Sequence, residues 1–300
     1  MKCVKIQIPR YKEPLTKDMA ICIPFFNPAE HVKLYMNLSL VLQTLTSAKI
    51  PWFVGEVAFM DRPWFFGDES NIYRFRSTSY MFYKEQILNQ MIQRVPEQYT
   101  KICILDGDIL FEDQDWYANL SEILDTSKIC QPFFISWLLD ATFITKDKYI
   151  SAASTPNLCG HPGYVWGFDR KWITQYPLPE FAVLGIGDFI FLKLIGSKQA
   201  IVKSRFGQLL PSIEKYIESS TMEHPTFLKS TIYHLYHGTI QNRQYPSRYT
   251  YISPILERES KRIEDIFVKN GSNLYEWIPE LRDELNTIVL KFFVDRQDDL

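Results

Sequence analysis

The sequence lacks a strong net charge of either sign and any apolar run long enough to span a bilayer. Its 33 lysines and arginines nearly balance its 35 aspartates and glutamates, for a formal net charge of −2. Without a positive field to hold a polyanion, general binding to nucleic acid or to an anionic membrane is disfavoured. The longest apolar candidate, residues 132–145, is interrupted by Asp140 and is shorter than the ~20 residues of a membrane span. No apolar segment follows the N-terminal lysines, so we expect a cytoplasmic protein with no signal peptide and no transmembrane segment.

Paired cysteines and several common catalytic motifs are missing as well. The five cysteines lie far apart and form no C-x-x-C pair. This favours reduced thiols in a reducing compartment over disulfides or a structural zinc site. The sequence also has no G-x-x-x-x-G-K-[ST] loop, no G-x-G-x-x-G after its first apolar run, no G-x-S-x-G and no H-E-x-x-H. P-loop NTPases, dinucleotide-binding domains, α/β-hydrolases and zinc enzymes of the H-E-x-x-H type are therefore disfavoured.

The residues that are present form an ordinary globular mixture, arranged as strands alternating with helices. Hydrophobic residues make up 46% and charged residues 23% of the chain, which excludes a largely disordered protein. An apolar run at residues 20–25 is typical of a buried parallel strand. Asn27 and Pro28 then suit the start of a helix that ends before Pro51, and a second apolar strand follows at residues 52–59. Together they predict a βαβ unit.

The same alternation continues and predicts a mostly parallel sheet flanked by helices. Further helices are expected at residues 79–94 and 116–126, and further strands at residues 101–105 and 129–137. From about residue 255 the composition becomes charged and favours helices at residues 257–269 and 278–293. The predicted fold class is therefore an α/β domain over residues 1–250, with a C-terminal helical extension over residues 251–300 packed on it.

The sharpest chemical signal is the segment Leu105-Asp106-Gly107-Asp108. Its two carboxylates flank a glycine at the end of an apolar strand, where ligand crevices open in parallel α/β sheets. The carboxylates could meet one divalent cation, and the cation could bind a diphosphate. Acidic turns after strands are also common solvated features. The apolar residues on both sides of this pair favour a metal, because buried carboxylates need compensation.

Five segments of the chain resemble one known family, and they extend over roughly residues 20–250. They are residues 20–28, residues 83–89, residues 105–111 with Asp115-Trp116, residues 163–168 with 184–188, and residues 233–238 with 242–245 and Arg248. These segments resemble glycosyltransferases of the GT-A fold, of the family-two-like kind found in bacteria, phages and large DNA viruses. The aspartate segment and the His-Gly segment, Tyr233-His234-Leu235-Tyr236-His237-Gly238, are the specific parts of the resemblance.

The resemblance implies a Rossmann-like nucleotide-sugar-binding fold and a sugar donor bound with Mn²⁺ or Mg²⁺. It implies that Asp108 ligates the metal and that Asp106 lies near the metal and the donor ribose. His237 would complete the metal site, with His234 as the alternative, because Gly238 after His237 leaves room for phosphate. Both histidines could instead pack or cap at a strand end. Phe25, Asn27 and Glu56, at two strand ends, would line the pocket for the nucleoside base.

An inverting transfer also needs a carboxylate that accepts the proton of the acceptor hydroxyl. Asp188 is the candidate, because it follows Gly185 and Gly187 in a turn of the kind in which the family places its base. Asp188 could instead cap a helix that begins at Phe189, since aspartate is a favoured cap. Asp140 is the second choice for the base.

Basic and aromatic residues complete the candidate site. Arg243, Arg248 and Lys84 are the cationic groups expected to neutralise the diphosphate, since arginine matches phosphate oxygens with two parallel hydrogen bonds. An aromatic platform for the acceptor is expected from Trp137, His161, Tyr164 and Trp166, although part of this set could belong to the core.

The sequence therefore predicts a metal-dependent glycosyltransferase that uses a UDP-sugar, or a GDP-sugar, and inverts the anomeric centre. The acceptor would be a glycan, a lipid-linked sugar or a protein side chain. A sugar-nucleotide nucleotidyltransferase is one alternative, although residues 24–28 lack the glycine and lysine of its usual loop. A nucleotide- or carbohydrate-binding module without turnover is the other.

Overall fold

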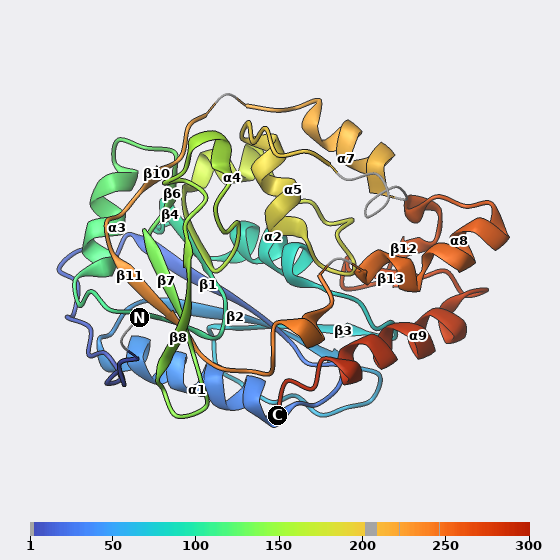
Figure 1. Ribbon diagram of the computed structural model, residues 1–300, viewed down its shortest axis with the longest axis horizontal. Coiled ribbons are helices and arrows are strands. Elements are labelled where there is room, and N and C mark those ends of the chain that lie inside the picture. Colours follow the sequence, from blue (N-terminus) through green and yellow to red (C-terminus); the bar gives the residue numbers. More distant parts are fainter. Residues whose placement is uncertain (1–2, 202–208, 222, 246) are drawn as a thin grey trace.

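A seven-stranded sheet forms the centre of the molecule (Figure 1), with strand order β10-β6-β9-β4-β1-β2-β3. The computed structural model describes residues 3–201, 209–221, 223–245 and 247–300. The strands are β1 (Met19–Phe26), β2 (Trp52–Phe59), β3 (Ile72–Ser77), β4 (Lys101–Leu105), β6 (Ile129–Gln131), β9 (Val165–Asp169) and β10 (Thr226–Phe227). Strands β4, β1, β2 and β3 are mutually parallel, and β9 is antiparallel to both of its neighbours. Because most of its pairings are parallel, this sheet places several strand ends along one edge.

Helices cover both faces of this sheet. They are α1 (Val32–Ser47), α2 (Lys84–Arg94), α3 (Trp116–Leu124), α4 (Arg170–Gln175), α5 (Gly187–Leu194) and α7 (Leu210–Ile217). Alternate residues of β1 belong to two different cores: Ile21 packs in the core that contains α1 and α3, whereas Cys22 packs in the core that contains α2, α4 and α5. A strand buried on both faces is continuously apolar, which is the pattern that the sequence shows.

A second, four-stranded sheet, of order β5-β11-β7-β8, lies beside the first. Its strands are β5 (Ile109–Phe111), β11 (Thr231–His234), β7 (Ile135–Leu139) and β8 (Thr145–Ile150). Residues 106–108 connect β4 of the large sheet to β5 of the small one. The amide of Leu235 donates to the carbonyl oxygen of Asp108 at 2.8 Å, which holds the end of β11 against this connection. The aspartate segment and the His-Gly segment therefore meet where the two sheets join.

The C-terminal fifty residues pack on the core that contains α2. They form α8 (Ser253–Glu259), the hairpin β12 (Phe267–Lys269) and β13 (Tyr275–Trp277), and α9 (Arg282–Asp295). Trp277, Leu285 and Phe292 from this segment belong to the same buried cluster as α2. Short 3₁₀ turns complete the described chain at Pro156–Leu158, Gln241–Arg243, Arg248–Tyr251 and Ile263–Asp265. Among the described residues, no helix combines the length and the apolar character that a membrane crossing requires.

The predicted fold class, a mostly parallel α/β sheet flanked by helices, is confirmed, but several element boundaries differ. The first helix begins at Val32 and not near Asn27, because the Asn27 side chain forms hydrogen bonds with both backbone groups of His31 and so holds a loop there. The helix expected from residue 79 begins at Lys84, because the amides of Tyr80 and Phe82 donate to Asn286 and Val183 instead of to a helix.

Two other predicted elements are divided. The strand expected over residues 129–137 is split into β6 and β7, which belong to different sheets, because Pro132 cannot donate a ladder hydrogen bond. The helix expected over residues 257–269 ends at Glu259, after which Ser260 adopts a left-handed backbone conformation. The C-terminal segment is therefore partly strand, whereas the sequence predicted helices alone.

Candidate active site

A cavity of about 450 Å³ opens beside the carboxyl ends of β1 and β4. This is the edge at which parallel α/β sheets bind ligands. Most residues proposed from the sequence line it: Phe25, Asn27, Lys84, Asp106, Asp108, His161, Tyr164, Asp188, His234, His237, Arg243 and Arg248. Four proposed residues, Glu56, Trp137, Asp140 and Trp166, are not among its described lining residues.

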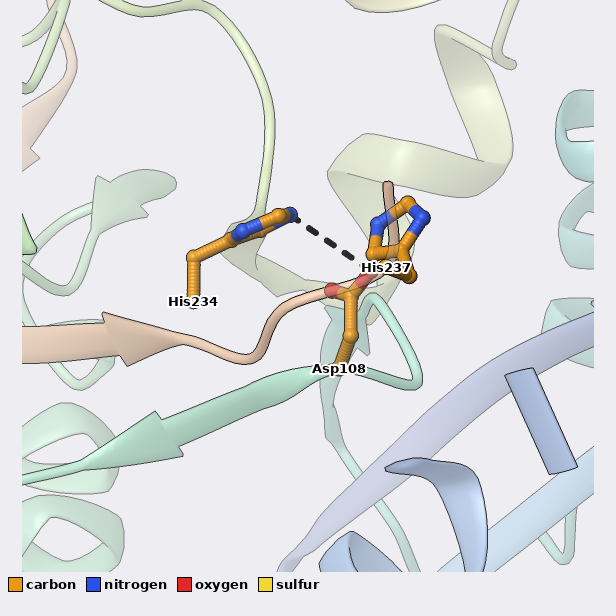
Figure 2. Close-up of side chains that lie close together, drawn as sticks. All are labelled: Asp108, His234 and His237. Carbon is orange, nitrogen blue, oxygen red and sulfur yellow. Dashed lines mark ion pairs between the residues drawn. The ribbon is translucent and has the colours of Figure 1, made fainter. Parts of the chain in front are cut away.

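Asp108, His234 and His237 form a group that could hold a metal ion (Figure 2). One ligand atom from each residue lies within 4.8 Å of the other two. Oδ2 of Asp108 is 2.8 Å from Nε2 of His237 and 3.6 Å from Nε2 of His234. Figure 2 shows the carboxylate between the two imidazole rings, one at the end of β11 and the other just beyond it. Both histidines are buried and Asp108 is partly buried.

The electrostatics of this group fit a cation. Burial opposes ionisation of Asp108, but His234, His237 and Arg243 outweigh it and hold the pKa of Asp108 below its usual range. Burial holds the pKa of His234 well below its usual range, which favours the neutral imidazole that a metal requires. Oδ1 of Asp108 is buried and accepts no hydrogen bond from any residue that the structure describes. A buried carboxylate oxygen without a donor is costly, and a bound cation would satisfy it.

Charged groups around His237 extend the site towards the C-terminal segment. Nη2 of Arg243 lies 2.9 Å from Nε2 of His237, and Oδ1 of Asp298 lies 3.0 Å from its Nδ1. Asp298 forms an ion pair of 3.1 Å with Nε of Arg296. Burial opposes the ionisation of Asp298, but the hydrogen bond from His237 and the charge of Arg296 lower the pKa of Asp298 to about 2.

Arg248 lies in the same part of the cavity and is almost fully buried. Burial lowers the pKa of its guanidinium to about 10, with the nearby charge of Arg296 acting in the same direction. Its Nε donates to the carbonyl oxygen of Arg243, and its guanidinium lies over the ring of Tyr245 at 4.3 Å. With Arg243, Arg248 and Arg296, this end of the cavity is rich in buried positive charge.

Lys84 links two carboxylates on the opposite side of the cavity. Its Nζ lies 2.7 Å from Oδ1 of Asp106 and 3.1 Å from both carboxylate oxygens of Asp188. Burial alone would lower the pKa of Lys84, but the charges of Asp106 and Asp188 outweigh it and raise that pKa. Burial is the largest cause of the raised pKa of Asp106, although Lys84 opposes it. The structure thus places Asp106 with Lys84 and only Asp108 with the histidines.

The glycines before Asp188 are explained by close packing. A Cβ at Gly185, whose φ is +87°, would lie 2.3 Å from Nη1 of Arg248, and a Cβ at Gly187 would lie 1.9 Å from Oε1 of Glu85. Asp188 lies inside the first turn of α5, and the N-cap position belongs to Ile186. The expectation that Asp188 caps this helix is therefore wrong, and its carboxylate faces the cavity.

The residues expected around the nucleoside base lie beside a smaller neighbouring cavity of about 240 Å³. Phe25 and Asn27 line both cavities, and Glu56 lines only the smaller one. Oε1 of Glu56 accepts a hydrogen bond of 2.5 Å from the amide of Phe65, so this carboxylate holds the loop after β2. The rings of Phe65 and Tyr35 lie 4.4 Å apart on the wall of this cavity.

The predicted aromatic platform is only partly in place. His161 and Tyr164 stack at 3.9 Å and 8° on the cavity wall, and burial lowers the pKa of His161 to about 3. Trp166 is 1% exposed, and its indole donates to the carbonyl oxygen of Pro162, so it belongs to the core. Trp137 lies outside the cavity lining, next to Lys148 of β8.

Asp140, the second choice for the base, lies in the turn between β7 and β8. Its carboxylate accepts hydrogen bonds from Thr142 and from the amide of Ile144, and it pairs with Lys146. These hydrogen bonds hold the pKa of Asp140 below its usual range. Asp140 is not among the cavity-lining residues and stabilises the turn.

The sequence reasoning missed four acidic, basic or histidine residues of the cavity: His31, Glu85, Arg296 and Asp298. Glu85 is 3% exposed, and burial, together with the charge of Asp188, raises its pKa. Its position next to Lys84 on a predicted helix was the available signal. No local pattern marks Arg296 and Asp298, because they reach the site only through the packing of the C-terminal segment.

No protein-family profile and no curated protein sequence matches this chain. Among solved structures, the chain is similar to glucosyl-3-phosphoglycerate synthase from Mycobacterium tuberculosis in complex with Mg²⁺ and uridine diphosphate. The identity is 12% and the TM-score 0.41, with 88% of each chain covered. It is also similar to Drosophila β1,4-galactosyltransferase 7, in a mutant complex with manganese, UDP-Gal and xylobiose, at 14% identity and a TM-score of 0.36. The matched region covers 58% of this chain and 58% of the galactosyltransferase chain.

A third similar structure is 4-diphosphocytidyl-2C-methyl-D-erythritol synthase from Anaerococcus prevotii. Its identity is 13% and its TM-score 0.35, with 71% of this chain and 89% of that chain covered. At these identities the similarity is one of fold.

Proposed function

We propose that this chain is a metal-dependent glycosyltransferase that moves a sugar from a nucleoside diphosphate sugar, with UDP as the expected nucleotide, to a hydroxyl acceptor. The observation that carries the proposal is the group formed by Asp108, His234 and His237 between the ends of β4 and β11, in which a buried carboxylate oxygen of Asp108 has no hydrogen-bond donor among the described residues. This group faces a cavity large enough for a small-molecule ligand. A cytoplasmic location stays a prediction from the sequence.

The donor atoms of this group suit Mn²⁺. Hard cations such as Mg²⁺ prefer an all-oxygen environment, whereas imidazole nitrogen favours first-row transition ions. Asp108, His234 and His237 would hold the ion. Asp106 would lie near the ion without ligating it, with its carboxylate paired to Lys84. When bound, the cation would supply positive charge to the diphosphate leaving group. Arg243 and Arg248 would add hydrogen bonds to the phosphate oxygens at the cationic end of the cavity.

The chain's carboxylates support a single displacement. An acceptor oxygen would bond to the anomeric carbon while the bond from that carbon to the diphosphate oxygen breaks. The nucleoside diphosphate leaves with the bonding electron pair, and the acceptor proton passes to Asp188. Asp188 lines the cavity, and the ammonium group of Lys84 donates hydrogen bonds to both of its carboxylate oxygens. Such a displacement inverts the configuration of the anomeric carbon.

The test measures what the full chain releases from a panel of UDP- and GDP-sugars, with Mn²⁺ or with EDTA. We expect nucleoside diphosphate release that requires the ion and that Asp108→Asn abolishes, because the neutral amide lacks the negative charge that attracts a divalent cation. Asp140→Asn is the matched control and should retain wild-type release, since Asp140 lies in a turn outside the cavity lining.

Two outcomes would contradict the proposal. Full activity in EDTA, or an unimpaired Asp108→Asn, would remove the metal site from the reaction. Release of pyrophosphate from a nucleoside triphosphate and a sugar phosphate would indicate a nucleotidyltransferase.

A further inference from the structure

The side chain of Asp298 lies directly behind His237, on the side away from Asp108. Its Oδ1 is 3.0 Å from Nδ1 of His237, while Nε2 of the same ring is 2.8 Å from Oδ2 of Asp108. The side chain of Asp298 is 1% exposed, and Nε of Arg296 lies 3.1 Å from its Oδ2. One imidazole thus bridges two carboxylates, one from the end of β4 and one from the C-terminal segment.

The hydrogen-bond partners define which nitrogen of His237 carries the proton. Nη2 of Arg243 and Oδ2 of Asp108 both face Nε2, at 2.9 Å and 2.8 Å. The carboxylate of Asp298 can only accept, so the proton lies on Nδ1. This is the form of histidine that ligates a metal.

Close backbone packing holds Asp298 in this place. Gly238, the residue after His237, has a φ of +76°, and a Cβ there would lie 2.9 Å from the carbonyl oxygen of Gln297 and 3.1 Å from Cα of Asp298. The next residue, Asp299, accepts a hydrogen bond of 2.7 Å from the amide of Lys33. The expectation that Gly238 leaves room for phosphate is therefore wrong, because the backbone of residues 296–298 fills that space.

We infer that Asp298 is a positioning residue that holds the His237 ring in the orientation and the protonation form needed to bind a divalent cation. The inference rests on the proposed metal site. A carboxylate behind a metal-binding histidine fixes the ring and raises its basicity, and its loss typically weakens metal affinity 10- to 100-fold.

The first experiment measures Mn²⁺ affinity of the full-length protein by electron paramagnetic resonance of the free ion, without donor or acceptor. Asp298→Asn is expected to raise the Kd about 10- to 100-fold, because the amide carries no charge and can rotate to donate to Nδ1. Asp299→Asn is the matched control and should bind as the wild type does, since Asp299 contacts His31 and Lys33 but not His237. Asp108→Asn should abolish binding at this site.

The results separate the inference from the proposed function. If the wild type and Asp108→Asn bind Mn²⁺ alike, the metal site itself is absent and the inference falls with it. If Asp108→Asn loses binding while Asp298→Asn binds as tightly as the wild type, the inference is overturned and the metal site stands.

The second experiment begins with the wild-type protein and needs no metal. Nitrogen-15 NMR of the histidine side chains, recorded in EDTA, reports which ring nitrogen is protonated. We expect the Nδ1–H form for His237 in the wild type and a shift towards the Nε2–H form in Asp298→Asn. Gly238→Ala keeps the carboxylate of Asp298, but its Cβ would displace the backbone of residues 297 and 298. This variant should also shift the His237 nitrogen signals towards the Nε2–H form. A wild-type His237 in the Nε2–H form would overturn the inference.

Discussion

The ammonium group of Lys84 contacts two carboxylates, Asp106 and Asp188, which come from different elements. Asp106 forms the shorter contact, 2.7 Å, directly follows β4 and lies two residues before Asp108. Asp188 extends from α5 and offers both oxygens to Lys84 at 3.1 Å. A Cβ at Gly163 would lie 2.8 Å from Oδ2 of Asp188, so the glycine leaves this carboxylate accessible. Such access is what a general base requires.

At this scale we predict that Asp188→Asn lowers the rate of sugar transfer by about two to four orders of magnitude, the usual contribution of a positioned base. Donor affinity should stay close to that of the wild type, because the diphosphate would lie beside the arginines and the cation. The measurement is single-turnover transfer together with equilibrium binding of the nucleoside diphosphate. A transfer rate within a few-fold of the wild type, or retention of the anomeric configuration by NMR, would remove Asp188 from this role.

Among the secondary-structure elements, those that form continuous apolar runs could be predicted from the sequence. Strands β2 and β4 occupy the expected residues, since burial on both faces requires an unbroken apolar segment. Helix starts could not be placed as well. Whether the amide of Phe82 donates to a helix or to Val183 is decided by a partner about a hundred residues away.

The same distinction applies to the site. Asp108 and His237 could be proposed because each lies in a recognisable segment at a strand end. Asp298 and Arg296 could not, because they reach His237 through the packing of residues 296–298 against Gly238, which no local sequence pattern marks. Trp166 was proposed for the cavity from its residue type, but β9 directs it into the core.

The hairpin β12–β13 is joined to the large sheet through Glu276. Its carboxylate accepts hydrogen bonds from the amide and hydroxyl of Thr78 and from Asn270, each between 2.8 and 2.9 Å. Burial opposes the ionisation of Glu276, but these hydrogen bonds outweigh it and lower its pKa. A lowered pKa means that the stabilisation is complete above the unfolded value, near pH 4.5, and is lost as the pH falls through the folded value.

We therefore expect Glu276→Gln to lower the free energy of unfolding by about 1.5–3 kcal/mol at pH 7, the range for hydrogen bonds to a charged group. The difference from the wild type should shrink as the pH falls from 5 towards 3. Urea unfolding at several pH values measures it, with Glu257→Gln, an exposed glutamate of α8, as the control. A difference independent of pH would mean that the charge of Glu276 is not what joins the hairpin to the sheet.

For the whole molecule, Asp108, His234, His237 and Asp298 connect the large sheet, the small sheet and the C-terminal segment. A ligand that binds only the folded state stabilises it by mass action, by about 2.7 kcal/mol at a concentration one hundred times its Kd. We predict that Mn²⁺ raises the Tm of the wild type by several degrees, that Mg²⁺ raises it less at equal concentration, and that neither changes the Tm of Asp108→Asn. Differential scanning calorimetry in EDTA and in each ion tests this. Equal shifts in both proteins would place the bound ion elsewhere.

The contact between His237 and Asp298 also has a consequence for the order of events during synthesis. Asp298 is translated about 190 residues after Asp108, which corresponds to roughly 10–40 s at a ribosomal rate of about 5–20 residues per second. Throughout that interval the nascent chain holds Asp108, and later both histidines, without the carboxylate that orients His237. High-affinity capture of the ion would therefore occur late, when residue 298 has joined the fold, and the growing chain would compete weakly for the cell's manganese until then.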